Sequence, residues 1–418
     1  MSHAASRQQE IPLATWTRGL QHSALQDMLV AGSRPGILSF ALGLPAAELF
    51  PVEAYSKALT HVLAADPHAL QYGPPFQPLK KHVVTLMAKR GVVCREEQVF
   101  LTSGAQQGMN LLARLLLEQG SRVIVEEKTY PGFQQVLQPY LPEILTVPTD
   151  LATGMDVDAV EKLLVEGARP ALIYASADGH NPLAVSMSSE KRRQLAKLAR
   201  HYRVPIIEDD AYGFLFYDDA ARPPLRALDD QWIFYVGTFS KILAPALRTG
   251  WVLVPESLMS LLATVKESTD INTAPLHQRA ISAYLDSGNL DEHLLKLRRE
   301  YGIRLDAMLR ALGKHLPEGT QWQKPGSGLF VWVELPPRVD TGALLEQAIE
   351  EEQLVFVPGH AFAIDKQSCP KNSIRLNFSN NPVDRIADGV ARLGRVLNRK
   401  RPAATKGGRQ AQGAAAAF

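Results

Sequence analysis

The chain has 418 residues, 46% of them hydrophobic, with 45 lysine and arginine residues against 43 aspartate and glutamate residues and a formal net charge of +2. This length suits two domains with a sizeable core, and the near-neutral charge argues against nucleic acid or a membrane surface as a partner. Cys94 and Cys369 show neither metal-ligand nor disulfide spacing, so we expect two buried apolar residues in a cytoplasmic protein. No stretch predicts a signal peptide or a membrane span.

Helices and strands alternate through the first two thirds of the sequence. The predicted helices cover residues 53–65, 77–90, 106–119 and 189–201. The predicted strands cover residues 99–102, 122–125, 171–175, 204–208, 232–236 and 250–254. Near-continuous apolar runs in these strands are typical of a parallel sheet buried on both faces. The pattern therefore predicts a large α/β domain over residues 53–287.

The last third predicts a smaller α+β domain over residues 288–398. Its predicted elements are a helix at 291–312, strands at 329–335 and 373–378, and a helix at 383–398. Residues 1–52 are expected to form an amino-terminal arm and part of this smaller domain. Residues 399–418 are rich in alanine and glycine, with basic but no acidic side chains, so we expect a disordered basic tail rather than a nuclear-localisation signal.

One segment after a predicted strand combines two hydroxyls with two cations: Thr238, Ser240, Lys241 and Arg248. Side chains at that point emerge at the carboxyl edge of the sheet, where this set suits a phosphorylated ligand. A partly desolvated lysine beside Arg248 should have a lowered pKa, and its neutral amine could act as a Schiff-base nucleophile. Taken alone, the segment fits a solvated loop lysine equally well.

Two more strand ends carry chemical signals. Residues 102–108 open a helix, so the amides of Ala105 and Gln106 could bind a phosphate at the positive end of the helix dipole, although small residues also serve packing alone at such turns. Residues 204–212 end in an acidic cluster with Asp209 and in Tyr212. Such a cluster is costly at a sheet edge unless a cation, such as a pyridinium nitrogen, pairs with it. An ordinary acidic turn is the alternative.

Six motifs stand in a recognisable order: Ser103-Gly104-Ala105-Gln106, Tyr130-Pro131-Gly132, Asn181-Pro182, Asp209-x-Ala211-Tyr212, Ser240-Lys241 with Arg248, and Arg375. Together they resemble the class I/II aminotransferases, which are fold-type-I pyridoxal-phosphate (PLP) enzymes, and most of all their 2-aminoadipate and kynurenine aminotransferase branch. The resemblance covers residues 43–398. It implies a large, mainly parallel-sheet domain, a smaller α+β domain, the cofactor pyridoxal 5′-phosphate, and transfer of an amino group from an α-amino acid to a 2-oxo acid.

The resemblance also implies a role for each motif. Lys241 would bind the cofactor as a Schiff base and shuttle the substrate's α-proton, while Asp209 would keep the pyridine nitrogen protonated. Tyr212 and Asn181 would bind the phenolic oxygen, and Tyr130 would stack on the ring. The residues expected at the phosphate are Ser103, Gly104, Ala105, Gln106, Ser240 and Arg248.

Substrate and partner residues follow in the same way from the resemblance. Arg375 would bind the substrate α-carboxylate, a task for which a planar bidentate donor is well suited. Gly43 and Asn181 would complete that site. Tyr72, in Gln71-Tyr72-Gly73, would enter the neighbouring subunit's site, which implies a homodimer with shared active sites.

Departures from the family pattern lie near the substrate. His180 replaces a glutamine, and Leu183-Ala184 replaces Thr-Gly, so this loop should pack differently; His180 either packs or brings a titratable ring near the site. Gln26 stands where the 2-aminoadipate branch often has an arginine. A neutral amide cannot make a charge-assisted pair with a distal carboxylate, so we expect acidic side chains to be poor substrates.

Two other functions stay open from the sequence. The same scaffold supports elimination, cyclisation or carbon–carbon bond formation, as in secondary metabolism, because these reactions also begin with removal of the α-proton. The remaining alternative is a PLP-binding effector domain of a transcription regulator. It is less favoured because only about 50 residues precede the first predicted helix, too few for a helix-turn-helix domain together with the arm.

Overall fold

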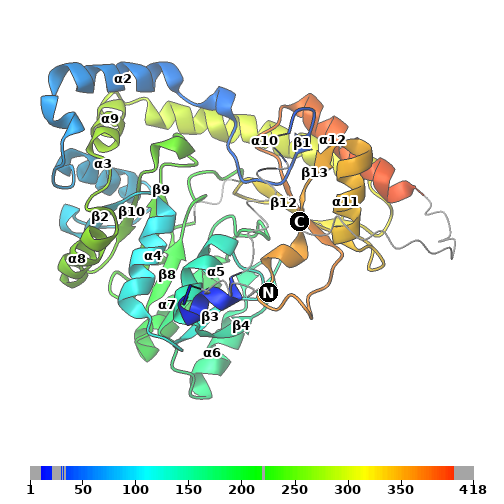
Figure 1. The fold of residues 1–418 in the computed structure, drawn as a ribbon, viewed down its shortest axis with the longest axis horizontal. Coiled ribbons are helices and arrows are strands. Elements are labelled where there is room, and N and C mark those ends of the chain that lie inside the picture. The colour runs from blue at the N-terminus through cyan, green and yellow to red at the C-terminus, as the bar shows by residue number, and fades with distance from the viewer. Residues whose placement is uncertain (1–10, 21–29, 31, 33, 219–221, 400–418) are drawn as a thin grey trace, which may run out of the picture.

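A computed structural model describes residues 11–20, 30, 32, 34–218 and 222–399. Two sheets organise this part of the chain, and the long helix α10 (Leu290–His315) connects the region around one to the region around the other (Figure 1). The expected residue Gln26 and nearly all of the expected tail lie outside the described residues. No helix within these ranges is long and apolar enough to cross a membrane.

The larger sheet is seven-stranded. In spatial order its strands are β2 (Val99–Thr102), β10 (Gly250–Leu253), β9 (Ile233–Thr238), β8 (Ile206–Asp209), β7 (Leu172–Ala175), β3 (Arg122–Glu126) and β4 (Glu143–Val147). Strands β9, β8, β7, β3 and β4 pair in parallel. Their carboxyl ends therefore meet at one edge, as the predicted α/β fold requires.

Strand β10 runs antiparallel to both of its neighbours, with Gly250 opposite Thr238 on β9 and opposite Thr102 on β2. The expectation that residues 250–254 join the sheet in parallel is therefore wrong. A parallel connection needs a crossover of about a dozen or more residues, and the loop 239–249 between β9 and β10 is too short for one. This short return instead holds Lys241 close to the carboxyl end of β9.

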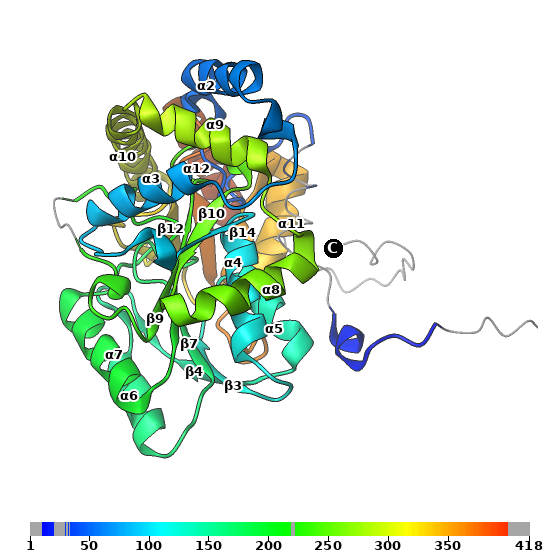
Figure 2. The ribbon, with the colours of Figure 1, turned by 90° about the vertical axis from the view of Figure 1, so that its left-hand side faces the viewer.

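Helices cover both faces of the large sheet (Figure 2). Phe234 and Val236 of β9 belong to a hydrophobic cluster on one face, and Ile233 to a cluster on the other, as strand alternation dictates. The first face is covered by α4 (Ala105–Leu116), α5 (Pro131–Leu137) and α8 (Met259–Asp270). The second is covered by α6 (Val157–Val165) and α7 (Ser189–Tyr202). The helices packed together beside strand β2 are α2 (Val52–Ala65), α3 (Gln77–Ala88) and α9 (Pro275–Asp286).

The smaller sheet is four-stranded and antiparallel throughout. Its order is β11 (Gln321–Trp322), β12 (Phe330–Glu334), β15 (Ser373–Asn377) and β14 (Val357–Pro358). It is accompanied by α10, α11 (Thr341–Glu352) and α12 (Val383–Asn398). Strand β1 (Leu38–Ser39) pairs in parallel with β13 (Leu354–Val355), so residues 38–39 lie beside this region. The assignment of residues 1–52 to an arm and part of the smaller domain stays a prediction.

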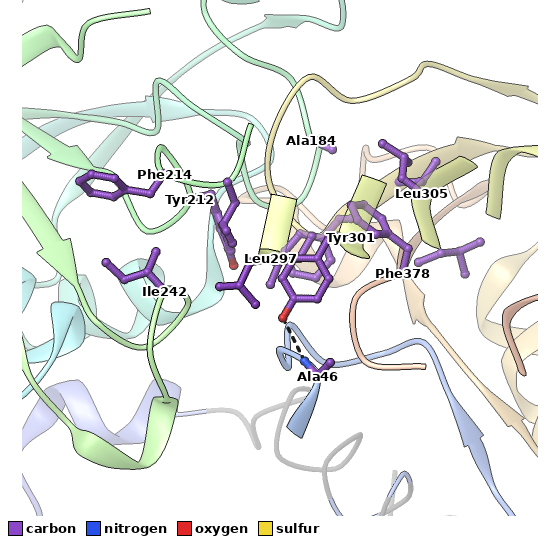
Figure 3. Packing of buried hydrophobic residues seen from close by; sticks show 14 of the residues in the cluster. Ala46, Ala184, Tyr212, Phe214, Ile242, Leu297, Tyr301, Leu305 and Phe378 are labelled. Atoms are coloured by element: carbon purple, nitrogen blue, oxygen red, sulfur yellow. Dashed lines mark hydrogen bonds between the residues drawn. The ribbon is translucent and has the colours of Figure 1, made fainter. Parts of the chain in front are cut away.

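One hydrophobic cluster runs through both regions and includes Leu38, Trp251, Tyr301 and Val396. Figure 3 shows its centre, where the hydroxyl of Tyr301 on α10 accepts a hydrogen bond from the backbone N–H of Ala46 at 3.1 Å. This contact fixes the segment that leads away from Gly43. Because a continuous core joins the two regions, the domain boundary at residues 287/288 stays a prediction.

Several smaller expectations are corrected. Cys94 is buried, but Cys369 is only half-buried, because it lies in an irregular connection before β15. Helix α4 ends at Leu116 instead of 119, and α10 extends to His315 instead of 312.

The remaining strands are the hairpin β5 (Thr149–Asp150) and β6 (Gly154–Met155). Short 3-10 helices lie at Thr15–Gly19, Ala47–Leu49, Pro67–Leu70, Glu96–Gln98, Gln138–Tyr140, Leu225–Ala227, Pro245–Leu247, Glu256–Leu258 and Gly359–Phe362.

Candidate active site

A cavity of about 570 Å³ opens at the carboxyl edge of the large sheet, next to β12 and β15 of the small one. Eleven of the residues expected from the sequence line it: Gly43, Ala105, Gln106, Tyr130, Asn181, Asp209, Tyr212, Ser240, Lys241, Arg248 and Arg375. They come from both sheets and from the segment after β1. Residues more than 300 positions apart in the sequence are thus brought together by the fold.

Lys241 occupies the loop between β9 and β10 and is half-buried. Its Nζ donates to the carbonyl oxygen of Gly43 at 2.7 Å. Burial, followed by the nearby guanidinium groups of Arg248 and Arg375, lowers the pKa of Lys241 to about 8. About a tenth of the Lys241 amines are therefore uncharged at pH 7, far more than for an ordinary lysine, and the uncharged amine is the state that attacks a carbonyl carbon.

Asp209 ends β8, with a buried side chain. Its Oδ2 accepts a hydrogen bond from the hydroxyl of Tyr174 at 2.7 Å, whereas Oδ1 is buried without a hydrogen-bond partner among the described residues. Burial raises the pKa of Asp209 to about 6, against the opposing effect of the Tyr174 hydrogen bond. A buried carboxylate oxygen without a partner is costly, so the site is complementary to a bound N–H donor or cation.

Two tyrosines flank this carboxylate. Tyr130 precedes α5, and a Cβ at Gly132 would lie 2.4 Å from its ring, so glycine is required there for the ring to keep its place. Tyr212 is buried and meets Phe330 edge-on, with ring centroids 5.9 Å apart. Burial raises the pKa of Tyr212, so its hydroxyl is a neutral hydrogen-bond donor. Figure 3 shows Tyr212 as a member of the hydrophobic cluster that also contains Tyr301.

A second group of donors gathers at the start of α4. The guanidinium of Arg248 approaches Ser240 Oγ at 3.4 Å and donates to the carbonyl of Ser103 at 3.2 Å. A Cβ at Gly104 would lie 2.4 Å from Arg248 Nη2, so only glycine leaves room for the guanidinium. Ala105 begins the helix with no side-chain cap, which leaves first-turn amides directed at the cavity end. The arrangement suits a phosphate group.

Ser103 and Gly104 do not line the cavity. The hydroxyl of Ser103 donates to Asp270 at 2.8 Å, and its backbone N–H donates to Gln107 Oε1 at 2.8 Å. Ser103 is expected at the phosphate, and in this geometry its hydroxyl is bound to Asp270, away from the cavity, so a cofactor contact of Ser103 stays a prediction. Both residues act on the cavity through Arg248.

Arg375 projects from β15 and is 2% exposed. Its guanidinium lies 4.0 Å from the ring centroid of Phe330 and 4.6 Å from that of Phe362. Nη1 donates to Asn181 Oδ1 at 2.6 Å, and Nη2 donates to the carbonyl of Ala41. Burial lowers the pKa of Arg375 to about 10. Within the described ranges no carboxylate is among the groups whose charge acts on Arg375, so a buried cation lines the cavity without a counter-ion.

Comparison with known proteins agrees with this geometry. The family model for aminotransferase class I and II matches residues 37–393. The chain is 35% identical to an aromatic-amino-acid aminotransferase of Thermococcus litoralis over 91% of this chain and 92% of that protein. It is 34% identical to a 2-aminoadipate transaminase of Thermus thermophilus over 90% and 94%. A crystal structure of Pyrococcus horikoshii kynurenine aminotransferase superimposes with a TM-score of 0.86 at 34% identity, covering 92% and 96%.

The chain belongs to the class I and II aminotransferases. It is a fold-type-I enzyme that uses pyridoxal phosphate to transfer an amino group from an α-amino acid to a 2-oxo acid. Three features of this aminotransferase fit the cofactor. They are the unpartnered Asp209 Oδ1, the cradle that Gly104 leaves for Arg248, and the lowered pKa of Lys241.

Tyr72 also lies outside the cavity lining, with 73% of its surface exposed. The adjacent loop is held by Asn272, whose Nδ2 donates to the carbonyl of Gly73 at 2.9 Å. The expected contact of Tyr72 with a neighbouring subunit stays a prediction.

His180 of this aminotransferase packs outside the cavity lining. It is 1% exposed, and its Nε2 lies 3.0 Å from Oε2 of the buried Glu126. Its Nδ1 accepts from the backbone N–H of Leu183 at 3.3 Å. His180 therefore packs against Glu126, yet it lies close enough to the site for its charge to act on the pKa of Asp209, so both alternatives from the sequence stay open. The neighbouring Ala184 adopts a φ of 59°, the left-handed conformation for which the family's glycine is better suited.

Sequence reasoning missed several lining and supporting residues. Tyr174, Phe330 and Phe362 flank Asp209 and Arg375, yet each looks like an ordinary core aromatic in the sequence. Leu42, Leu44 and Met109 line the cavity without any motif. For Tyr174 a signal did exist: it occupies a buried strand adjacent to β8, and a buried phenol usually finds a hydrogen-bond partner.

Proposed function

We propose that this aminotransferase takes its amino group from α-amino acids with neutral, apolar or aromatic side chains in preference to dicarboxylic ones. The cavity lining carries the proposal. Among the described lining residues the cations are Lys241, Arg248 and Arg375. Each already has a proposed role: Lys241 at the reacting carbon, Arg248 at the phosphate and Arg375 at the α-carboxylate. No described lining residue supplies a further cation for a distal carboxylate.

The rest of the lining supports the same preference. Leu42, Leu44 and Met109 are apolar, and Gln135 is neutral. A distal carboxylate placed against them would be desolvated without a charge-assisted partner, at a cost of about 1.5–3 kcal/mol. The relatives named for aromatic amino acids and for kynurenine point the same way, whereas the 2-aminoadipate relative points the other way. The predicted effect of Gln26 stays a prediction from the sequence.

The proposed division of labour follows from the contacts. Bound pyridoxal phosphate supplies a carbonyl carbon and an electron-withdrawing ring. Asp209 Oδ1 would hold the proton on the ring nitrogen, while Tyr174 fixes the other carboxylate oxygen. Lys241 Nζ would bind the cofactor and then move the proton from the substrate α-carbon. Tyr212 and Asn181 would donate to the phenolic oxygen, and Tyr130 would cover the ring.

At the two ends of the cavity, cations would bind anions. Ser240, Arg248 and the amides of Ala105 and Gln106 would hold the phosphate. Arg375, oriented by Asn181 and Phe330, would bind the substrate α-carboxylate as a planar donor.

We further propose a cytoplasmic homodimer in which Tyr72 reaches the partner's cavity. The exposure of Tyr72 on a fixed loop supports the shared site. Two free cysteines suit a reducing compartment.

Single-turnover experiments test the substrate preference without choosing an amino acceptor. Holoenzyme is mixed with phenylalanine, leucine, 2-aminoadipate or glutamate, and the cofactor absorbance and the 2-oxo acid product are followed. The expected ratio of rate constant to dissociation constant favours the neutral donors about tenfold to a hundredfold. The matched variant Arg375→Met should weaken all four donors alike, because they share the α-carboxylate. Preference of the unchanged enzyme for 2-aminoadipate or glutamate would overturn the proposal.

A further inference from the structure

A closed polar network lies outside the cavity, between α4 and α8, which pack against each other (Figure 2). It consists of Ser103, Gln107, Lys266 and Asp270, called here the α4–α8 network. Lys266 Nζ donates to Asp270 Oδ1 at 2.6 Å and to Gln107 Oε1 at 2.8 Å. Asp270 Oδ2 in turn accepts from Gln107 Nε2 at 2.6 Å and from the Ser103 hydroxyl at 2.8 Å.

The location of these charges is energetically demanding. Lys266 is 5% exposed, and burial lowers its pKa. Asp270 is the last residue of α8, where the helix dipole disfavours a carboxylate. Burial raises the pKa of Asp270, yet hydrogen bonds from Lys266, Gln107 and Ser103 hold it below its ordinary value. Lys266 is the buried member, whereas Ser103, Gln107 and Asp270 are half-buried. Removing one member takes at least one hydrogen bond from another, and the loss is largest where it falls on the buried Lys266 ammonium.

The network holds Ser103, the residue two positions before the start of α4, in place. Ser103 is held by its hydroxyl, on Asp270, and by its backbone N–H, on Gln107. Its carbonyl oxygen accepts from Arg248 Nη2 at 3.2 Å. The next residue, Gly104, leaves no room between the backbone and Arg248. A shift of Ser103 would therefore move both the Arg248 guanidinium and the first amides of α4.

We propose that Lys266, Asp270 and Gln107 are positioning residues for the phosphate group of pyridoxal phosphate. They act through Ser103 on Arg248 and on the first turn of α4, without touching the cofactor. The inference rests on the proposed phosphate contacts at Ala105, Gln106, Ser240 and Arg248. A purely structural role, in which the network only joins two helices, predicts a different result.

Cofactor affinity separates the two roles. Lys266→Met is prepared without cofactor, and the dissociation constants of pyridoxal phosphate and of pyridoxal, which lacks the phosphate, are measured by absorbance titration. We expect affinity for pyridoxal phosphate to fall about tenfold to a hundredfold while affinity for pyridoxal changes less than about twofold. Lys57→Met is the matched control, because Lys57 also pairs with an acid four residues away, Glu53, at 2.6 Å on an exposed helix surface. It should change neither constant.

A second variant covers the case in which Lys266→Met does not fold. Gln107→Met removes the network's central amide and should lower affinity for pyridoxal phosphate selectively as well. Equal losses for both ligands, or no loss in either folded variant, overturn the positioning role. Arg248→Met distinguishes this outcome from failure of the proposed phosphate site, since it should discriminate between the two ligands whether or not the network matters. If Arg248→Met does not discriminate, the proposed phosphate site itself is wrong.

Discussion

Lys241, Asp209 and Arg375 are three ionisable side chains whose burial changes what each can do. Burial lowers the pKa of Lys241 to about 8 and raises that of Asp209 to about 6. Arg375 stays charged at neutral pH although burial lowers its pKa to about 10. Burial therefore makes the uncharged amine of Lys241 more accessible near neutral pH than that of an ordinary lysine, while Arg375 keeps the charge that a substrate carboxylate requires.

The pH dependence of cofactor binding checks the state of Lys241. Protein without cofactor should attach pyridoxal phosphate covalently at a rate that rises with pH and levels off above a midpoint near pH 8, because only the neutral amine reacts. At pH 8 about half of the Lys241 amines are neutral, against less than about 1% of ordinary lysines. Stopped-flow absorbance measures the rate, and Lys241→Ala should show no attachment. A midpoint near that of an ordinary lysine would contradict the lowered pKa.

Replacing Asp209 with Asn tests the contact with the ring nitrogen. The amide keeps the shape of the side chain and can still accept from Tyr174, but it cannot hold a proton on the ring. We expect kcat to fall about a hundredfold to a thousandfold with cofactor still bound, the usual size of a lost preorganised charge contact. Steady-state kinetics with cofactor content measured in parallel gives the answer. Turnover equal to that of the unchanged enzyme would show that Asp209 has another role.

At the scale of elements, the antiparallel pair β9–β10 determines the shape of the lysine loop. Gly237 on β9 lies opposite Trp251 on β10, and a Cβ there would be 2.3 Å from the indole. Trp251 is fully buried, with the ring of Phe239 at a centroid distance of 5.0 Å. The absent side chain at Gly237 therefore makes room for an aromatic group beneath the loop that carries Lys241.

Gly237→Ala should destabilise this pair and disturb the loop. Overpacking a buried aromatic typically costs about 1–3 kcal/mol, so the free energy of unfolding should fall by that amount, and affinity for pyridoxal phosphate should fall with it. Denaturant unfolding and cofactor titration measure the two effects.

Gly302→Ala is the control. Gly302 lies within α10 with nothing within 4 Å of an added Cβ, so alanine there should raise the free energy of unfolding by up to about 1 kcal/mol. Equal effects of the two substitutions would rule out the steric explanation.

For the whole molecule, the proposed shared site makes a quantitative prediction. Chains carrying Tyr72→Phe and chains carrying Lys241→Ala are refolded together in equal amounts. In each mixed dimer one cavity has both an unchanged Lys241 and an unchanged Tyr72 from the partner, so about a quarter of all cavities are restored. Activity should therefore exceed the average of the two separate variants. Activity equal to that average would show that Tyr72 does not act across subunits.

The sequence by itself was sufficient for the order of elements and for most cavity residues. Short motifs at strand ends, such as those around Lys241 and Asp209, could be assigned to the cavity because the carboxyl ends of parallel strands meet at one edge of the sheet. Helix α12 agrees with its predicted range for the same kind of reason: its apolar spacing and its polar ends are local properties.

Tertiary structure decided the features that depend on distant neighbours. The direction of β10 follows from the length of the preceding loop and from pairing on both sides, which no local pattern encodes. The Ser103 hydroxyl points to Asp270 instead of the cavity because α8, more than 150 residues later, presents a carboxylate there. Tyr174 and Phe330 belong to the site only because the fold places them against Asp209 and Arg375. Strand periodicity determines which face a side chain occupies, but hydrogen-bond partners across the fold determine what that side chain does.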